Sequence, residues 1–326
     1  MPIKPPRLRP GDTVAIVAPA SAPPDPEAVD RSVAVLEQLG FKPKLAPNVR
    51  KRWGFLAGSD RDRASDLMKM FTDRKVRAIL CLRGGYGTAR LLPLLDYKTI
   101  RTNPKIFIGF SDITSLHCAF LVKSNLVSFH GPMLNSDLIK PDCPSFTGES
   151  LFRTVMLACP SGRLNPPHNS KLKTRNLKLS PAISLRRGIA SGPLIGGNIS
   201  LLCTTLGTPY QPSFKNRILF FEDLDEVPYR FDRMLTHLLN AGLLQQVAGI
   251  AIGNNPDCED PKAKTCKEYR QTLTDVFKER LLPLKVPVVM NLPFGHVPFN
   301  ATIPVGIRAT LDGDKRELIV TESAVV

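Results

Sequence analysis

The chain has 326 residues, of which 43% are hydrophobic, and 44 basic residues outnumber 29 acidic ones for a formal net charge of +15. This length fits about two domains of ~150 residues each. No apolar run approaches the ~18 residues of a membrane helix, so no membrane partner is expected. The N-terminus lacks the apolar core of a signal peptide, so we expect a cytoplasmic protein. The seven cysteines, with no CxxC pair, indicate neither a disulfide framework nor a structural zinc site.

Most basic residues are dispersed along the chain. The densest run comprises Lys171, Lys173, Arg175 and Lys178, with Arg186 and Arg187 beyond it. The run lies in a stretch rich in Pro, Asn and Ser and has no interleaved aromatic residues. A solvated linker is therefore favoured over a nucleic-acid patch, and no nucleic-acid partner is predicted. Attraction of an anionic substrate stays open.

The first half alternates strand and helix patterns. We expect strands at 13–18, 41–46, 76–82 and 106–110, and helices at 26–39, 60–72, 88–95 and 111–123. The first strand is a short apolar run closed by Pro-Ala-Ser, and the first helix ends at a glycine of the kind that caps helices. This alternation predicts an α/β fold whose first sheet is mainly parallel and flanked by helices.

The second half contains a smaller set of similar elements. We expect strands at 217–221, 247–252 and 286–290, helices ending near 206 and at 230–241 and 267–281, and a final hairpin around 312–314. A proline-rich, basic stretch separates the halves and has the composition of a boundary. The sequence therefore predicts an N-terminal α/β domain at 1–165, a linker at 166–188 and a second, smaller α/β domain at 189–326.

Ser111 follows the predicted strand 106–110 directly and opens the next helix. Gly109 permits a tight turn, which would expose the Ser111 hydroxyl at the edge of the sheet. The same turn would place the Asp112 amide at a helix N-terminus, ready to donate to a developing oxyanion. The pattern is similar to G-x-S-x-G, although Ile113 replaces its second glycine. Ser before Asp is also a common helix N-cap, and on this segment alone the cap is the favoured interpretation.

A serine nucleophile needs a base, and the chain has only five histidines. His117 would point away from its helix start, His168 lies in the basic linker, and His237 is expected to be structural. His130 precedes Gly-Pro and could line a site. His296 ends a Pro- and Gly-rich loop after a buried strand, which is the best setting for an exposed imidazole.

The base needs an acid to orient it, and four acids follow the strand 217–221. Glu222 comes first off this strand and is the natural orienting residue, whereas metal binding lacks a second ligand set. The glycine-rich turn of Arg83, Gly84 and Gly85 follows another strand. It matches no nucleotide motif, so it could cradle a phosphate, lend an amide to an oxyanion hole or be only a tight turn.

Several stretches, taken together and in order, resemble the LD-carboxypeptidase family, the S66 serine peptidases. The resembling stretches are GDTVAIVAPAS at 11–21, GFLAG at 54–58, RGGYGTARLLPLLDY at 83–97, IGFSDITSLH at 108–117, GPLIGGNISLL at 192–202, FFEDLDEVPYRFDRML at 220–235 and NLPFGH at 291–296. They span most of the chain, and the ordered set is specific. The sequence departs from the family pattern at 160–187 and 257–261, segments that can shape a substrate pocket.

The resemblance implies a nucleophile from the N-terminal domain and an acid and base from the C-terminal one. By position these are Ser111, Glu222 and His296, with the amides of Asp112 and Gly85 as the oxyanion hole. The family acts on cell-wall muropeptides, releases a terminal D-alanine from an L-centre, uses no metal or other cofactor, and usually forms homodimers. A carboxypeptidase must also bind the terminal carboxylate, for which arginine is suited. Arg83 is the candidate by its place in the glycine-rich turn.

Two alternatives accompany this interpretation. Some members of the family cleave the amide of peptide-nucleotide antibiotics and confer immunity to a microcin. Such a substrate needs an aromatic side chain on which its base can stack. Trp53 is the only tryptophan of the chain, and we expect it to pack near the domain surface. The other alternative is a catalytically inactive basic binding protein with a hydrolase fold. The net charge favours the inactive protein, whereas the intact Ser, Glu and His set argues against it.

Overall fold

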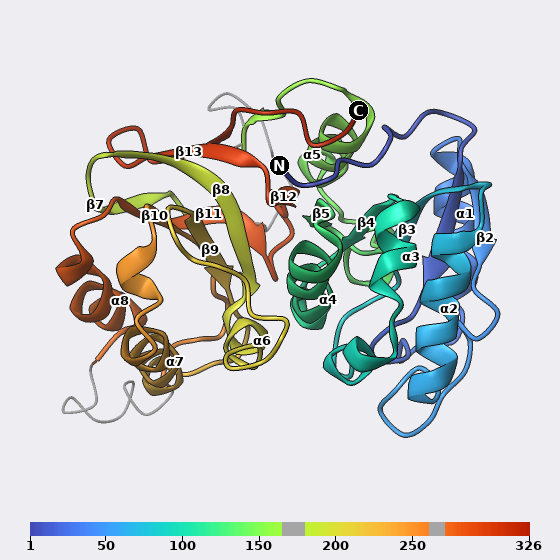
Figure 1. Cartoon of the computed structure of the whole chain (residues 1–326), viewed down its shortest axis with the longest axis horizontal. Helices are drawn as coiled ribbons and strands as arrows, with labels where there is room; N and C mark the ends of the chain where they lie inside the picture. Colours follow the sequence, from blue (N-terminus) through green and yellow to red (C-terminus); the bar gives the residue numbers. More distant parts are fainter. Residues whose placement is uncertain (165–179, 261–270) are drawn as a thin grey trace.

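The computed structural model describes residues 1–164, 180–260 and 271–326. Two sheets lie side by side, the first built mostly from the blue to green segments and the second from the yellow to red ones (Figure 1). The basic run at 171–178, His168 and the first part of the helix expected at 267–281 lie outside the described residues. Within the described ranges, no helix has both the length and the apolar character needed to cross a bilayer.

The first sheet has the strand order β12-β5-β4-β3-β1-β2. Its strands are β1 (Thr13–Val17), β2 (Lys42–Leu45), β3 (Val76–Cys81), β4 (Ile106–Gly109), β5 (Ser128–His130) and β12 (Ile303–Val305). All neighbours pair in parallel except β12, which is antiparallel to β5. The α-helices of this half are α1 (Ala28–Gln38), α2 (Asp60–Thr72), α3 (Tyr97–Thr102), α4 (Thr114–Ala119) and α5 (Ser145–Met156). Short 3₁₀ and π segments are η1 (Ala89–Leu94), η2 (Ser111–Ile113), η3 (Phe120–Ser124) and η4 (Leu134–Leu138).

The second sheet has the order β6-β14-β13-β8-β9-β10-β11-β7. Its strands are β6 (Gly162–Arg163), β7 (Ile183–Arg186), β8 (Ile189–Asn198), β9 (Ile218–Glu222), β10 (Gly249–Asn254), β11 (Val288–Gly295), β13 (Arg308–Asp312) and β14 (Glu317–Val320). Strands β8 to β11 are parallel, and β13 and β14 form the expected antiparallel hairpin. Its helices are α6 (Ile199–Cys203), α7 (Pro228–Asn240) and α8 (Leu273–Leu281), with η5 (Leu244–Gln246) and η8 (Leu282–Leu284).

The predicted α/β class, with a mainly parallel first sheet and a second α/β unit, is confirmed. Helix α2 spans the predicted 60–72 because Ser59 and Asp62 form a reciprocal capping box at its start. The helix expected at 88–95 is instead the 3₁₀ segment η1, which contains Pro93. The stretch 291–295, expected as a loop, continues strand β11 up to Gly295.

Two short strands cross between the sheets. β12 comes from the C-terminal part of the chain yet pairs with β5 of the first sheet. β6 precedes the boundary stretch yet pairs with β14 of the second sheet. The chain therefore exchanges one strand in each direction, which fixes the two sheets relative to each other.

An aromatic cluster fills the core beneath the first sheet. Phe107 on β4 is fully buried, and its ring lies 4.9 Å from that of Phe120 and 6.3 Å from that of Phe71. Such rings contribute large buried areas in preferred edge or offset contacts. Since β4 leads directly into Ser111, this cluster supports the strand that carries the predicted nucleophile.

We expect Phe107→Ala to lower the free energy of unfolding by about 3–5 kcal/mol, because truncation of a buried Phe leaves a cavity. Phe55→Ala is the matched control, since Phe55 is 65% exposed, and it should change stability by less than about 0.5 kcal/mol. Urea unfolding of both variants measures the difference. Equal effects would contradict the assignment of the core.

Candidate active site

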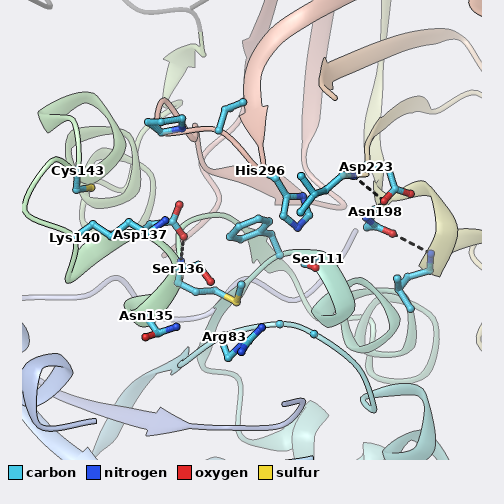
Figure 2. Close-up of a pocket in the computed structure, with 18 of the residues that line it drawn as sticks. Arg83, Ser111, Asn135, Ser136, Asp137, Lys140, Cys143, Asn198, Asp223 and His296 are labelled. Atoms are coloured by element: carbon cyan, nitrogen blue, oxygen red, sulfur yellow. Dashed lines mark hydrogen bonds between the residues drawn. The ribbon is translucent and has the colours of Figure 1, made fainter. Parts of the chain in front are cut away.

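A pocket of about 710 Å³ lies between the two halves of the molecule. It is formed at the carboxyl ends of parallel strands, where open α/β sheets place their sites. The first sheet contributes Arg83 after β3 and Ser111 after β4, and the second contributes Asn198, Asp223 and His296 (Figure 2). The volume falls within the ~300–1,000 Å³ typical of small-molecule sites.

Ser111 occupies a strained corner. Its φ is +63°, a left-handed value that a non-glycine residue rarely adopts. A Cβ on Gly84 would lie 3.0 Å from Ser111 Oγ, so only glycine permits this approach of the neighbouring turn. Among the described residues, Ser111 Oγ makes no hydrogen bond, so the helix-cap interpretation is wrong. Ser111 lines the pocket with its hydroxyl unpartnered among the described residues.

The Asp112 side chain anchors the glycine-rich turn to this corner. It is buried and accepts a hydrogen bond from the Thr88 amide at 2.8 Å. The Thr88 hydroxyl in turn donates to the carbonyl of Asp112. Burial raises the pKa of the Asp112 carboxyl, partly offset by these hydrogen bonds. A role was predicted only for the Asp112 amide, yet the Asp112 side chain also positions the glycine-rich turn.

Gly85 requires a glycine for two reasons. Its φ is +111°, and a Cβ there would lie 2.4 Å from Ser21 Oγ. Both Gly85 and Arg83 line the pocket. The Arg83 guanidinium donates to the Ala22 carbonyl at 3.3 Å and forms no ion pair with any described carboxylate. It therefore faces the pocket without a direct ion-pair partner among the described residues. Figure 2 shows Ser111 between Arg83 and His296 in this view.

Glu222 and His296 meet at the edge of the second sheet. His296 Nδ1 lies 2.6 Å from Glu222 Oε2, and the carboxylate is fully buried. Gly295 has a φ of +104°, and a Cβ there would lie 2.7 Å from Glu222 Oε2. Only glycine therefore allows the backbone to run this close to the carboxylate. The ring of Phe110, beside Ser111, packs edge-on against His296 at 4.9 Å. The structure thus brings Ser111, Glu222 and His296 together.

Opposing effects set the pKa of His296. Burial lowers it, because the imidazolium ion loses solvation. The charge and hydrogen bond of Glu222 raise it, and the charges of Asp223 and Asp137 add to this. The net pKa is raised from the ordinary value of 6.5. Protonated His296 therefore stabilises the folded state. This stabilisation is complete below about pH 6.5 and is lost as the pH rises through the higher pKa of the folded state.

Comparison with known families accounts for this arrangement. Residues 14–131 match the LD-carboxypeptidase N-terminal domain, and residues 191–311 match the LD-carboxypeptidase C-terminal domain. The chain belongs to the LD-carboxypeptidase family, S66. It is therefore a serine peptidase of the carboxypeptidase type.

Relatives span nearly the whole LD-carboxypeptidase chain. A probable murein peptide carboxypeptidase of Bacillus subtilis (strain 168) is 38% identical over 320 residues, 97% of this chain and 94% of that protein. Murein tetrapeptide carboxypeptidase of Pseudomonas aeruginosa is 35% identical, covering 93% and 94%. The microcin C7 self-immunity protein MccF of Escherichia coli is 27% identical, covering 96% and 94%. A solved structure of MccF with aspartyl sulfamoyl adenosine has a TM-score of 0.88 at 25% identity and full coverage of both chains.

The other described histidines of this LD-carboxypeptidase lie outside the pocket. His130 does not line it: its ring is fully buried, 5.3 Å from that of Phe220. His117 is also buried and bonds Ser128 Oγ and the Gly109 carbonyl, each at 2.8 Å. Burial lowers the pKa of His117 to about 4. His237, expected to be structural, is exposed on α7.

Sequence reasoning counted Asp223 among four acids after a strand without giving it a role of its own, and it missed Asp137, the second buried acid of the pocket. Asp223 accepts hydrogen bonds from Asn198 Nδ2 at 2.8 Å and from Ser200 Oγ at 2.7 Å. Burial raises the pKa of Asp137 to about 6, and the Met133 amide donates to its carboxylate. The position of Asp223 next to Glu222 could have indicated that it lies at the site. Asp137 lies in a π-helical turn that has no sequence motif. Among residues 1–164, 180–260 and 271–326, no cluster of His, Cys, Asp and Glu is arranged to hold a metal.

We expect NMR titration to give His296 a pKa above 6.5 and Glu222→Gln to lower it, because the substitution removes the largest opposing charge and leaves burial in place. Glu27→Gln is the control, because Glu27 is an exposed acid at the start of α1, in the half that contains the first sheet. It should leave the titration of His296 unchanged. A His296 pKa unaffected by Glu222→Gln would contradict the pairing.

Proposed function

We propose that this enzyme hydrolyses the L,D-peptide bond at the end of a murein tetrapeptide and releases D-alanine through an acyl-enzyme on Ser111. The observation that carries the proposal is the shared pocket of a strained, unbonded Ser111 and a His296 held by buried Glu222. The murein peptide substrates named for the Bacillus and Pseudomonas relatives support the choice of substrate.

His296 is the proposed base. Because Glu222 engages Nδ1, Nε2 is the nitrogen left to receive the Ser111 proton. Ser111 Oγ then attacks the scissile carbonyl to form a tetrahedral intermediate. The two side chains share the pocket without a hydrogen bond in the described structure. Catalytic hydrogen bonds often tighten only once substrate is bound.

The amides of Asp112 and Gly85 are the proposed oxyanion hole. The Asp112 amide follows Ser111 at the start of a helical turn, and Gly85 lines the same pocket. Each such donor is worth about 10²–10³-fold in turnover. As the intermediate collapses, the C–N bond breaks and His296 gives its proton to the leaving amine of D-alanine. Water then attacks the ester, His296 takes a proton from it, and Ser111 regains its own.

Arg83 is the proposed partner of the terminal carboxylate. Its guanidinium faces the pocket, has only a carbonyl partner at 3.3 Å, and forms no direct ion pair with a described acid. A planar guanidinium can bind both oxygens of a carboxylate. This arrangement would select a free C-terminus over an internal peptide bond.

Amide cleavage in a peptide-nucleotide is the second candidate. The likeness to MccF, whose solved structure contains aspartyl sulfamoyl adenosine, favours it. Trp53 does not line the pocket and is 58% exposed, so it offers no stacking surface for a base there. The murein peptide therefore remains the first choice.

Ser111→Ala should reduce D-alanine release from an L,D-linked muropeptide tetrapeptide by at least about 10³-fold, because the nucleophile is lost. Released D-alanine is measured for the variant beside the wild type. Ser115→Ala is the control, since Ser115 is buried in α4 and does not line the pocket. Near-normal turnover by Ser111→Ala would disprove the mechanism. Release by neither protein would redirect the assay to peptide-nucleotide amides.

Arg83→Gln should raise KM for the tetrapeptide by about tenfold or more, because the substrate carboxylate loses a charge-assisted pair. A tetrapeptide with an amidated C-terminus should show little difference between variant and wild type. Arg50→Gln is the control, because Arg50 is exposed and pairs with Asp30 away from the pocket. An equal KM increase for acid and amide would assign Arg83 to another role.

A further inference from the structure

A chain of hydrogen bonds crosses from the nucleophile corner to the strand beside Glu222. Its first member is Thr114, three residues after Ser111 and fully buried at the start of α4. We propose that Thr114 is a positioning residue that sets the register of Ser111 against His296. The inference rests on the proposed function, since it concerns the alignment of that nucleophile and base.

The contact between Thr114 and β8 is close and specific. Thr114 Oγ1 accepts a hydrogen bond from the Asn198 amide at 2.9 Å. Gly197 has a φ of +139°, and a Cβ there would lie 2.4 Å from Thr114 Oγ1 and 2.7 Å from its Cγ2. Both the hydroxyl and the methyl of Thr114 therefore fit against the end of β8. Figure 1 shows α4 facing this end of β8 and helix α6.

On the β8 side, the contact with Thr114 is linked to Glu222, the acid that holds His296. Asn198 lies in register with Glu222, because β8 and β9 pair in parallel up to these residues. The Asn198 side chain donates to Asp223 at 2.8 Å and also caps α6 through the Leu201 amide. Asp223 follows Glu222 directly in the chain. A shift of α4 against β8 would therefore move Ser111 relative to Glu222 and the imidazole that it holds.

Thr114 itself does not line the pocket, so it touches no substrate. Its loss should reduce the chemical step more than substrate binding, since displacement of a reacting group by about 1 Å can cost ~10²-fold. Thr114→Val keeps the shape and removes the acceptor, whereas Thr114→Ser keeps the acceptor. Thr154→Val is the matched control, because the buried Thr154 hydroxyl bonds only the Ser150 carbonyl of its own helix.

The experiment measures kcat and KM for D-alanine release. A serine-directed fluorophosphonate probe counts the reactive active sites, and its rate of reaction with the enzyme is measured as well. We expect Thr114→Val to lower kcat per reactive site and the probe rate by about 10- to 100-fold, with KM within about threefold of wild type. Thr114→Ser and Thr154→Val should stay within about threefold. Thr114→Ala, with the same expected loss, replaces Thr114→Val if that variant does not fold.

Counting sites separates positioning from folding, because misfolded molecules lower the number of sites and not the rate at each. Wild-type kcat and probe rate per site in Thr114→Val would overturn the inference, as would an equal loss in Thr114→Ser. A wild-type enzyme whose Ser111 does not react with the probe would overturn the proposed function and this inference together. A reactive wild type with an unaffected Thr114→Val would overturn the inference alone.

Discussion

The hydrogen bond between Glu222 and His296 is the interaction on which the site depends. A carboxylate buried to this extent is stable only if it is paired, and His296 is its partner at 2.6 Å. The pair forms because β9 and β11 run parallel, with β10 between them, and end at one edge of the sheet. The pair also requires a glycine at position 295, because any Cβ there would collide with the Glu222 carboxylate. The imidazole is thus fixed by one nitrogen and offers the other to the pocket.

Ser111, the proposed nucleophile, follows a strand of the other sheet, so its proposed role requires the two sheets to be held in register. The segment after His296 does much of this, because it crosses to the first half and becomes β12 beside β5. On the way, Thr147 of α5 bonds the Pro298 carbonyl at 2.6 Å and the Asn300 amide at 3.0 Å. The residues that follow His296 are therefore fastened to the half that carries Ser111. Exchange of β6 in the opposite direction reinforces the same arrangement.

Two of the strand ends at the site, after 106–110 and 217–221, could be predicted from the sequence, and with them the positions of Ser111 and Glu222. Both residues directly follow a short apolar run, and parallel strands gather such positions at one edge. His296 was instead predicted from a Pro- and Gly-rich loop, which in the structure is the end of β11. Strand β8 was not predicted because its glycines have the composition of a turn. The structure explains them by close approach: a Cβ on Gly196 would lie 1.7 Å from the Phe220 carbonyl oxygen. The β12 crossing was beyond prediction because three residues carry too little pattern to specify a partner strand in another sheet.

The charges around the pocket explain why the pKa of the part-buried His296 is raised, which suits its proposed role as a base. Burial alone would lower the pKa of His296 and leave a weak base, as it does for the buried His117. The charge and hydrogen bond of Glu222 reverse the direction, and the charges of Asp223 and Asp137 reinforce it. A general base is most effective when its pKa lies near the working pH. The acids that sequence patterns left without a role thus support the basicity of His296 from a distance, while Glu222 alone determines which nitrogen is free to act.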